Sequence, residues 1–147
     1  MLLNNDESNR WDQRHSSADG PGEVARVLLD NSHLLPTTGV ALDLASGRGA
    51  NALVLAKAGL AVTAWDRSSV AIAKLQAFAK EQGVSISTEV RDVIAMPPAP
   101  DSFDLILVSN FFAPELAPSL IASLKPNGLL MYQTYCKTKK DGTGPSN

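Results

Sequence analysis

The order of apolar and amphipathic segments along this chain predicts an α/β fold with a doubly wound, mainly parallel sheet. Short β-branched runs alternate with segments of helical periodicity, and glycine or proline stands at most of the junctions. The run "FDLILVS" at 103–109 is almost wholly apolar, which is typical of a strand buried on both faces. Because crossovers between parallel strands are right-handed, we expect helices on both faces of the sheet.

Proline and glycine residues mark where the elements up to the second strand begin and end. Residues 20–35 have a helical apolar face, Pro21 suits an early helical position, and Pro36 ends the segment. The strand "GVALDLA" follows, and the helix "GANALVLAKAG" ends at Gly59. "LAVTAW" at 60–65 then reads as a second strand, which completes a strand-helix-strand unit.

The later elements are predicted in the same way. Ser68 or Ser69 can cap a helix that ends at Gly83, and "VSISTEVR" alternates as a third strand. The prolines of "AMPPAPDS" exclude a long helix before the strand at 103–109. "APELAPSLIASLK" predicts a helix, "PNG" a turn, and "LLMYQTY" a fifth strand.

Length and composition indicate a single domain with a small-molecule partner. The chain has 147 residues, of which 44% are hydrophobic, and its net charge of −2 provides no basic field for nucleic acid. Its one cysteine, Cys136, cannot form an internal disulfide, and no Cys/His spacing predicts a metal site. We expect a cytoplasmic protein, without a secretory signal or a membrane span.

We divide the chain into three parts. Residues 1–19 are polar and are expected to be a flexible segment or a lid. Residues 20–136 form the domain, and residues 137–147 form a polar tail.

An aspartate stands at the end of each of the first three strands: Asp43, Asp66 and Asp92. In a parallel sheet these ends meet at one edge, where ligands bind. Gly47 and Gly49 follow the first strand, where they allow a tight turn and a close approach of a ligand. Each aspartate also has a structural interpretation, since such junctions often carry capping carboxylates.

The same turn has an alternative interpretation as a nicotinamide-dinucleotide site. "GRGANA" satisfies the pattern G-x-G-x-x-(G/A), with Asp66 near the position of a ribose-binding acid. Asp43 argues against a diphosphate, because its carboxylate would repel the anion. S-adenosylmethionine has no phosphate and presents a sulfonium, an ammonium, a ribose diol and an adenine amine, and the three carboxylates could accept hydrogen bonds or charge from these groups.

The segments "VALDLASGRGANALVLAKAGLAVTAWDRSSVAIAKLQ", "RDV", "FDLILVSNFF" and "LKPNGLLMYQTY" resemble the successive motifs of class I S-adenosylmethionine-dependent methyltransferases. Within that superfamily the chain is most similar to the tellurite-resistance and thiopurine methyltransferase-like group. The resemblance implies a Rossmann-like sheet of order 3-2-1-4-5, with strands six and seven missing, so that the chain is either a truncated or a minimal form. It departs from the family at Ala45, where glycine is usual. The cofactor-binding residues that it implies are Asp43, Ala45, Gly47, Gly49, Asn51, Asp66, Arg67, Asp92, Val93 and Ser109.

The methyl acceptor is expected to be a small, soft nucleophile such as a thiol or a selenium or tellurium species, because no convincing general base stands out. Asn110 and Phe111 are expected to line the acceptor pocket, and His15 is the candidate base. "SNFF" lacks the two prolines of amino-methyltransferases that act on nucleic-acid bases, which argues against such a substrate.

Two further interpretations stay open at this point. The chain could bind the cofactor without turnover, as an incomplete or scaffold domain, or, more distantly, it could bind a nicotinamide cofactor. An exposed edge at residues 129–135 also predicts self-association through the fifth strand.

Overall fold

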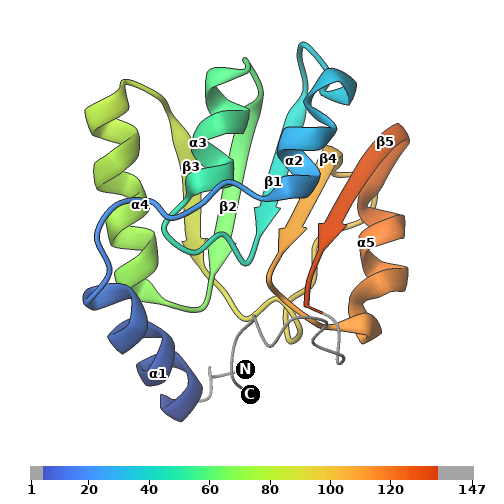
Figure 1. Cartoon of the computed structure of the whole chain (residues 1–147). Helices are drawn as coiled ribbons and strands as arrows, with labels where there is room; N and C mark the ends of the chain where they lie inside the picture. The colour runs from blue at the N-terminus through green and yellow to red at the C-terminus, as the bar shows by residue number, and fades with distance from the viewer. Residues whose placement is uncertain (1–4, 136–147) are drawn as a thin grey trace.

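The computed structural model describes residues 5–135, which form a five-stranded sheet in the order β3-β2-β1-β4-β5. All neighbouring strands are parallel, so the predicted fold class and strand order are confirmed (Figure 1). The strands are β1 Val40–Leu44, β2 Ala61–Asp66, β3 Ile86–Val90, β4 Phe103–Ser109 and β5 Leu124–Gln133. The α-helices are α1 Asn5–Ser16, α2 Arg26–Asp30, α3 Ala50–Lys57, α4 Ser69–Gln82 and α5 Ala117–Ser123, and two 3₁₀ turns are η1 Ser32–Leu34 and η2 Pro114–Leu116.

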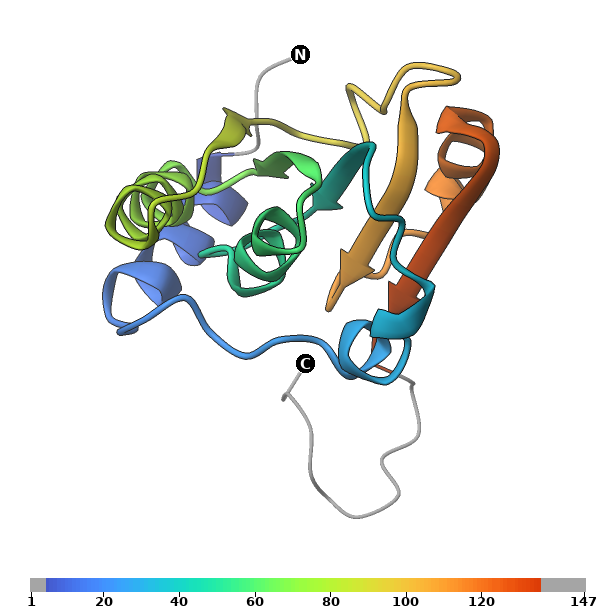
Figure 2. The same cartoon turned by 90° about the horizontal axis from the view of Figure 1, so that it is seen from above.

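The helices form two layers around the sheet. Helices α2, α3 and α4 cover one face (Figure 2). On that face Leu28, Leu55 and Leu75 pack against alternate residues of the central strands. Helix α5 covers the other face, where Leu120 packs with Leu42 and other buried side chains. Successive residues of β1 therefore point into different layers, and Asp43 points to the layer that contains α3.

Several local predictions are confirmed by the capping geometry. Ser68 is the N-cap of α4, and its Oγ accepts a hydrogen bond from the backbone N–H of Ala71 at 3.1 Å. Gly83 ends the same helix in the left-handed region, with φ of 71°. The proline-rich stretch after β3 forms turns and no helix, as its composition predicted.

The helix predicted over 20–35 was too long. Gly20 and Gly22 have φ of 71° and 92°, so the backbone cannot be helical there, and Pro21 lies between them outside any helix. The regular part is α2 alone, and the 3₁₀ turn η1 follows it. This segment crosses the sheet as an extended strap before it becomes helical (Figure 1).

The turn predicted at "PNG" lies within β5 and does not precede the strand. Strand β5 already begins at Leu124, which pairs with Phe103, and the next paired residues are Leu129 and Leu105. The residues in between bulge out of the ladder, with Asn127 at φ of 64°. The turn signal was real, but pairing with β4 on both sides of it incorporates it into one strand.

The N-terminal segment carries helix α1, which packs against α4. It lies beyond the edge of the sheet toward which the strand arrows point (Figure 1). The helix is therefore placed beside the carboxyl ends of the strands, where the sequence predicts a ligand site. The predicted tail at 137–147 lies outside the described residues.

Candidate functional site

Asp43 is the most unusual group at this edge of the sheet, because it is fully buried without a partner. Its side chain is 0% exposed, and neither carboxylate oxygen has a hydrogen-bond partner in the described part of the chain. Burial, with a smaller contribution from the neighbouring charge of Asp66, raises the pKa of Asp43 to about 8, and the nearby backbone N–H of Ala52 offsets only part of this without reaching hydrogen-bond geometry. A buried carboxylate without a donor costs folding free energy unless a ligand supplies one.

The turn after β1 is built from left-handed residues. Gly47 and Gly49 have φ of 56° and 97°, and Gly49 is the N-cap of α3. A Cβ atom on Gly49 would lie 2.5 Å from Cγ of Leu75, so the close packing of α4 also requires glycine there. Ala45, at the position where the resemblance predicts glycine, has φ of 61°, a conformation that is strained for an L-residue.

Asp66 ends β2 and holds this turn in place. Its Oδ2 accepts the N–H of Gly47 at 2.8 Å, and its Oδ1 accepts the N–H of Ser68 at 2.9 Å. Burial raises the pKa of Asp66, while these two backbone donors and the charges of His15 and Arg67 lower it again. A carboxylate has about four lone-pair sites, so two acceptor sites are left for a ligand.

His15 lies against the same turn, although its candidate role concerned the acceptor. Its ring lies 3.5 Å from the position that a Cβ atom of Gly47 would occupy, and its Nδ1 is 3.1 Å from Nη1 of Arg48. Since a guanidinium only donates, Nδ1 is the acceptor in this contact. Burial lowers the pKa of His15, against the attraction of Asp66, and the charge of Arg48 lowers it further.

Asn51 and Arg48 attach the N-terminal strap to the site. Asn51 is buried, and its Oδ1 accepts the N–H of Ala25 at 2.8 Å. Arg48 is half-buried and donates from Nε to the carbonyl of Gly20 at 2.7 Å. Both residues therefore fasten residues 20–25 over the glycine turn.

Asp92 and Val93 follow β3 at the same edge. Asp92 Oδ1 accepts the N–H groups of Ile94 at 3.1 Å and Ala95 at 3.3 Å, while Oδ2 receives no hydrogen bond within residues 5–135. Val93 is 5% exposed and packs in the core layer that contains Trp65. Trp65, which is 7% exposed, is a core residue of the same layer.

The ends of β4 and β5 form the other half of the edge. Asn110, at φ of 58°, donates its N–H to the carbonyl of Gln133 at 2.9 Å. The Tyr132 hydroxyl donates to the carbonyl of Phe111 at 2.6 Å and accepts the N–H of Ala113 at 3.3 Å. Phe111 is half-buried against the core, and Ser109, at the end of β4, is half-buried as well.

The sequence from residue 41 to residue 128, more than half of the chain, matches the family model described as "Methyltransferase domain". The chain belongs to the methyltransferase domain family.

Curated relatives agree with this assignment. The chain is 34% identical over 87 residues to the probable S-adenosyl-L-methionine-dependent methyltransferase TehB of Haemophilus influenzae, covering 57% of this chain and 30% of that protein. It is 31% identical over 94 residues to an uncharacterized protein of Mycobacterium tuberculosis, covering 60% and 34% of the two chains. The chain thus spans 30% to 34% of the length of these relatives.

Solved structures agree on the fold. The crystal structure of TehB from Haemophilus influenzae superimposes with a TM-score of 0.61 at 24% identity, covering 82% of this chain and 41% of that one. Phosphoethanolamine N-methyltransferase 1 of Haemonchus contortus, in complex with phosphoethanolamine and S-adenosylhomocysteine, gives 0.75 at 20% identity, covering 94% and 34%. The resemblance to class I S-adenosylmethionine-dependent methyltransferases near the tellurite-resistance group is confirmed.

In this methyltransferase domain, the structure gathers two groups of residues that the sequence singled out. Around the ends of β1 and β2 lie Asp43, Ala45, Gly47, Gly49, Asn51, Asp66, Arg67 and His15, while Asp92 with Val93 and Ser109 with Asn110 and Phe111 follow β3 and β4. His15 therefore lies with the residues at the ends of β1 and β2, and not with Asn110 and Phe111.

Sequence reasoning missed three side chains that organise this edge: Lys74, Asp12 and Tyr132. Lys74 Nζ donates to the carbonyls of His15, Ser16 and Ala18 at the end of α1, and Asp12 Oδ1 accepts from the Ser68 hydroxyl at 2.5 Å. No local signal marks these residues, because each partner is more than 15 positions away in the sequence.

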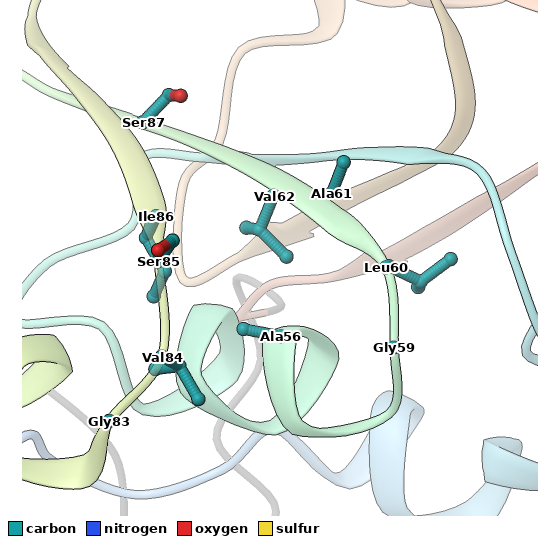
Figure 3. A pocket seen from close by; sticks show the side chains of 10 residues that line it. All are labelled: Ala56, Gly59, Leu60, Ala61, Val62, Gly83, Val84, Ser85, Ile86 and Ser87. Atoms are coloured by element: carbon teal, nitrogen blue, oxygen red, sulfur yellow. The ribbon is translucent and has the colours of Figure 1, made fainter.

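A surface pocket of about 580 Å³ lies at the opposite edge of the sheet, between the starts of β2 and β3 (Figure 3). Ala61, Val62, Ile86 and Ser87 are among its lining residues, and none of the three aspartates is. Of residues 5–135, no helix is long and apolar enough to cross a bilayer.

Proposed function

We propose that this methyltransferase domain binds S-adenosylmethionine and transfers its methyl group to a small, soft nucleophile. The observation that carries the proposal is Asp43, whose two buried carboxylate oxygens have no hydrogen-bond donor among residues 5–135 and lie beside a glycine turn and Asp66. Such a group fits a cationic ligand and not a diphosphate.

Each of the three carboxylates could accept hydrogen bonds from a different part of the cofactor. Asp43 would receive the ammonium of the amino-acid end, and Asp66, with its two remaining acceptor sites, would receive the ribose hydroxyls. Asp92 Oδ2 would accept the adenine amine, with Val93 as the apolar wall. When bound, S-adenosylmethionine supplies an electrophilic methyl group on a sulfonium.

The residues of this chain would act by positioning and by excluding water. Orientation alone can supply on the order of 7 to 11 kcal/mol toward such a displacement. Around Asn110 and Phe111 the described contacts are backbone groups and the Tyr132 hydroxyl, with no carboxylate or imidazole bonded there. A soft acceptor that ionises by itself needs no base, which supports a thiol, selenium or tellurium species.

We propose α1 as the lid of the cofactor half. Asp12 bonds the N-cap of α4, Lys74 bonds the end of α1, and His15 lies on the glycine turn. These contacts support closure over the ribose site. Limited proteolysis tests it: S-adenosylmethionine should protect residues 1–19 from cleavage, and unchanged cleavage would remove the lid role.

We also propose that the chain self-associates through β5. Within the described residues β5 pairs only with β4, so its other edge supports pairing with a second copy of the chain. A purely monomeric mass by light scattering would contradict this. The cytoplasmic location stays a prediction.

Calorimetric titration with S-adenosylmethionine, S-adenosylhomocysteine and NADH tests the function. We expect binding of the two sulfur nucleosides and none of NADH, followed by turnover with a panel of thiols and chalcogen oxyanions. Binding without turnover would instead support an incomplete or scaffold domain. Absence of binding by all three ligands would overturn the proposal.

A further inference from the structure

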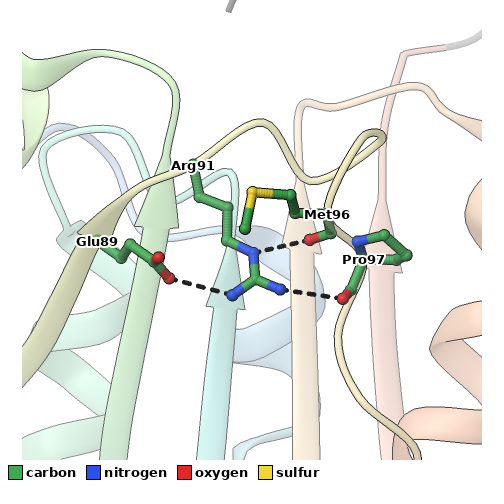
Figure 4. A network of polar contacts seen from close by, with 4 residues as sticks. All are labelled: Glu89, Arg91, Met96 and Pro97. Atoms are coloured by element: carbon green, nitrogen blue, oxygen red, sulfur yellow. Dashed lines mark hydrogen bonds and ion pairs between the residues drawn. The ribbon is translucent and has the colours of Figure 1, made fainter. Parts of the chain in front are cut away.

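Arg91 lies directly after β3, in a network of polar contacts with Glu89, Met96 and Pro97 (Figure 4). None of these residues belongs to the predicted cofactor site. The guanidinium carbon of Arg91 lies 3.8 Å from the centroid of the Trp65 ring. Nε donates to the carbonyl of Met96 at 2.7 Å, Nη2 to that of Pro97 at 3.0 Å, and Nη1 to Glu89 Oε2 at 3.1 Å. The Arg91 side chain is 17% exposed, whereas its three hydrogen bonds lie at the exposed surface of the loop.

These contacts close a loop around Asp92. The N–H of Arg91 is bonded to the carbonyl of Asp66 at 2.8 Å, which fixes the start of the loop to β2. The guanidinium fixes the far side at Met96 and Pro97, and the N–H of Met96 is bonded to the carbonyl of Asp92 at 2.9 Å. Asp92 is thus held from both sides, with Oδ2 left without a hydrogen bond among the described residues.

No helix supports this segment, because the crossover from β3 to β4 is made of turns. In a helix, backbone hydrogen bonds would hold the residues that follow Asp92. Here the carbonyls of Met96 and Pro97 are bonded by the side chain of Arg91 instead. A planar guanidinium can stack on an indole ring and donate to two carbonyls at once, and a lysine ammonium cannot reproduce that geometry.

We propose that Arg91 is a positioning residue for purine recognition: by stacking on Trp65 and bonding the Met96 and Pro97 carbonyls, it holds Asp92 so that the site selects a 6-amino over a 6-oxo purine. This inference rests on the proposed function. It deepens that function, because it assigns the choice of the purine to a residue that does not touch the ligand.

The test compares the affinities for S-adenosylhomocysteine and S-inosylhomocysteine, which carries oxygen in place of the 6-amino group. The wild-type chain should favour the amino form by about tenfold or more, as for a hydrogen bond to a charged group. Arg91→Met should lose most of that preference, by weakening the amino form and leaving the oxo form unchanged. Arg91→Lys keeps the charge and much of the stem, and should lose the preference as well.

Glu89→Gln is the matched control, since it removes only the half-exposed ion pair and leaves both carbonyl contacts intact. Its preference should equal that of the wild type. Retained preference in the folded Arg91 variants, or an equal loss for both ligands, would overturn the inference and reduce Arg91 to a structural residue. A wild-type chain that binds neither ligand would instead overturn the proposed function.

Discussion

The carboxyl ends of β1 and β2 differ from those of β4 and β5 in what the fold has buried there. Asp43 and Asp66 are 0% and 8% exposed and lie beneath a glycine turn, a strap and a helix, whereas Phe112 and Tyr135 are 69% and 52% exposed. The ends of β1 and β2 are stabilised by charged side chains, and the ends of β4 and β5 by backbone contacts and the Tyr132 hydroxyl. The ends of β1 and β2 therefore present buried charge, and the ends of β4 and β5 present exposed aromatic rings; under the proposed function the first would be the cofactor half and the second the acceptor half.

The largest effect is expected where the cofactor half is packed most closely. Gly49→Ala places a Cβ atom 2.5 Å from Leu75 Cγ at φ of 97°, so we expect a loss of about 3 kcal/mol in the free energy of unfolding, from overpacking plus strain. Urea unfolding measures it. Gly83→Ala is the control, because it has a similar backbone but nothing within 4 Å, and should lose only about 1 kcal/mol. Equal losses would contradict the packing argument.

The next effect separates binding from stability. Asp66→Ala should weaken S-adenosylmethionine binding by about 1.5 to 3 kcal/mol, since charged hydrogen bonds are worth that much. Asp104→Ala is the control. Asp104 Oδ2 also accepts a backbone N–H, from Val40 at 2.8 Å, but these two residues lie at the amino ends of β4 and β1, on the opposite edge of the sheet from Asp66. Calorimetry should find its affinity unchanged. An unaltered affinity in folded Asp66→Ala would remove Asp66 from the site.

The buried carboxylate predicts a pH dependence of stability. Because burial raises the pKa of Asp43 to about 8, the folded chain holds a proton there that the unfolded chain releases near pH 4. Its stabilising contribution is therefore fully present below about pH 4 and falls as pH rises to about 8, by at most about 1.4 kcal/mol per pH unit. Urea unfolding between pH 5 and 8 should give a flatter profile for Asp43→Asn, which keeps Asp66 and His15. Parallel profiles would show that Asp43 does not hold this proton.

A smaller effect tests strain in the same turn. Ala45 has φ of 61°, so Ala45→Gly should raise the free energy of unfolding by about 1 kcal/mol. Ala58, exposed at φ of −74°, provides the control, and Ala58→Gly should lower it by about 0.5 to 1 kcal/mol. A loss in both variants would mean that Ala45 is not strained.

The smallest effect on stability is expected in the acceptor half. Phe112→Ala removes an exposed ring, so the free energy of unfolding should change by less than about 0.5 kcal/mol, with cofactor affinity unchanged. Turnover of the acceptor should fall if the ring contacts it. Ile121→Ala, a similarly exposed residue on α5, should leave turnover unchanged, and equal turnover in both variants would separate Phe112 from the acceptor.

Much of the candidate site was predictable because its signals are local. Asp43, Asp66 and Asp92 follow apolar strands, and a parallel sheet brings such positions to one edge. The roles of Arg91 and Lys74 were not predictable in the same way. Lys74 donates to three backbone carbonyl groups and Arg91 to two, and the amino-acid types in a sequence do not show which carbonyl groups will be near.

The sequence by itself determined the order of the elements, the Ser68 cap, the glycine turn and the family, since hydrophobic periodicity and backbone restriction act over a few residues. Only the tertiary structure decided that Asp43 is buried without a donor, that His15 rests on Gly47, and that the turn near Asn127 becomes part of β5. Burial and strand pairing depend on segments distant in the chain, and the desolvation of a charge exists only when those segments have come together.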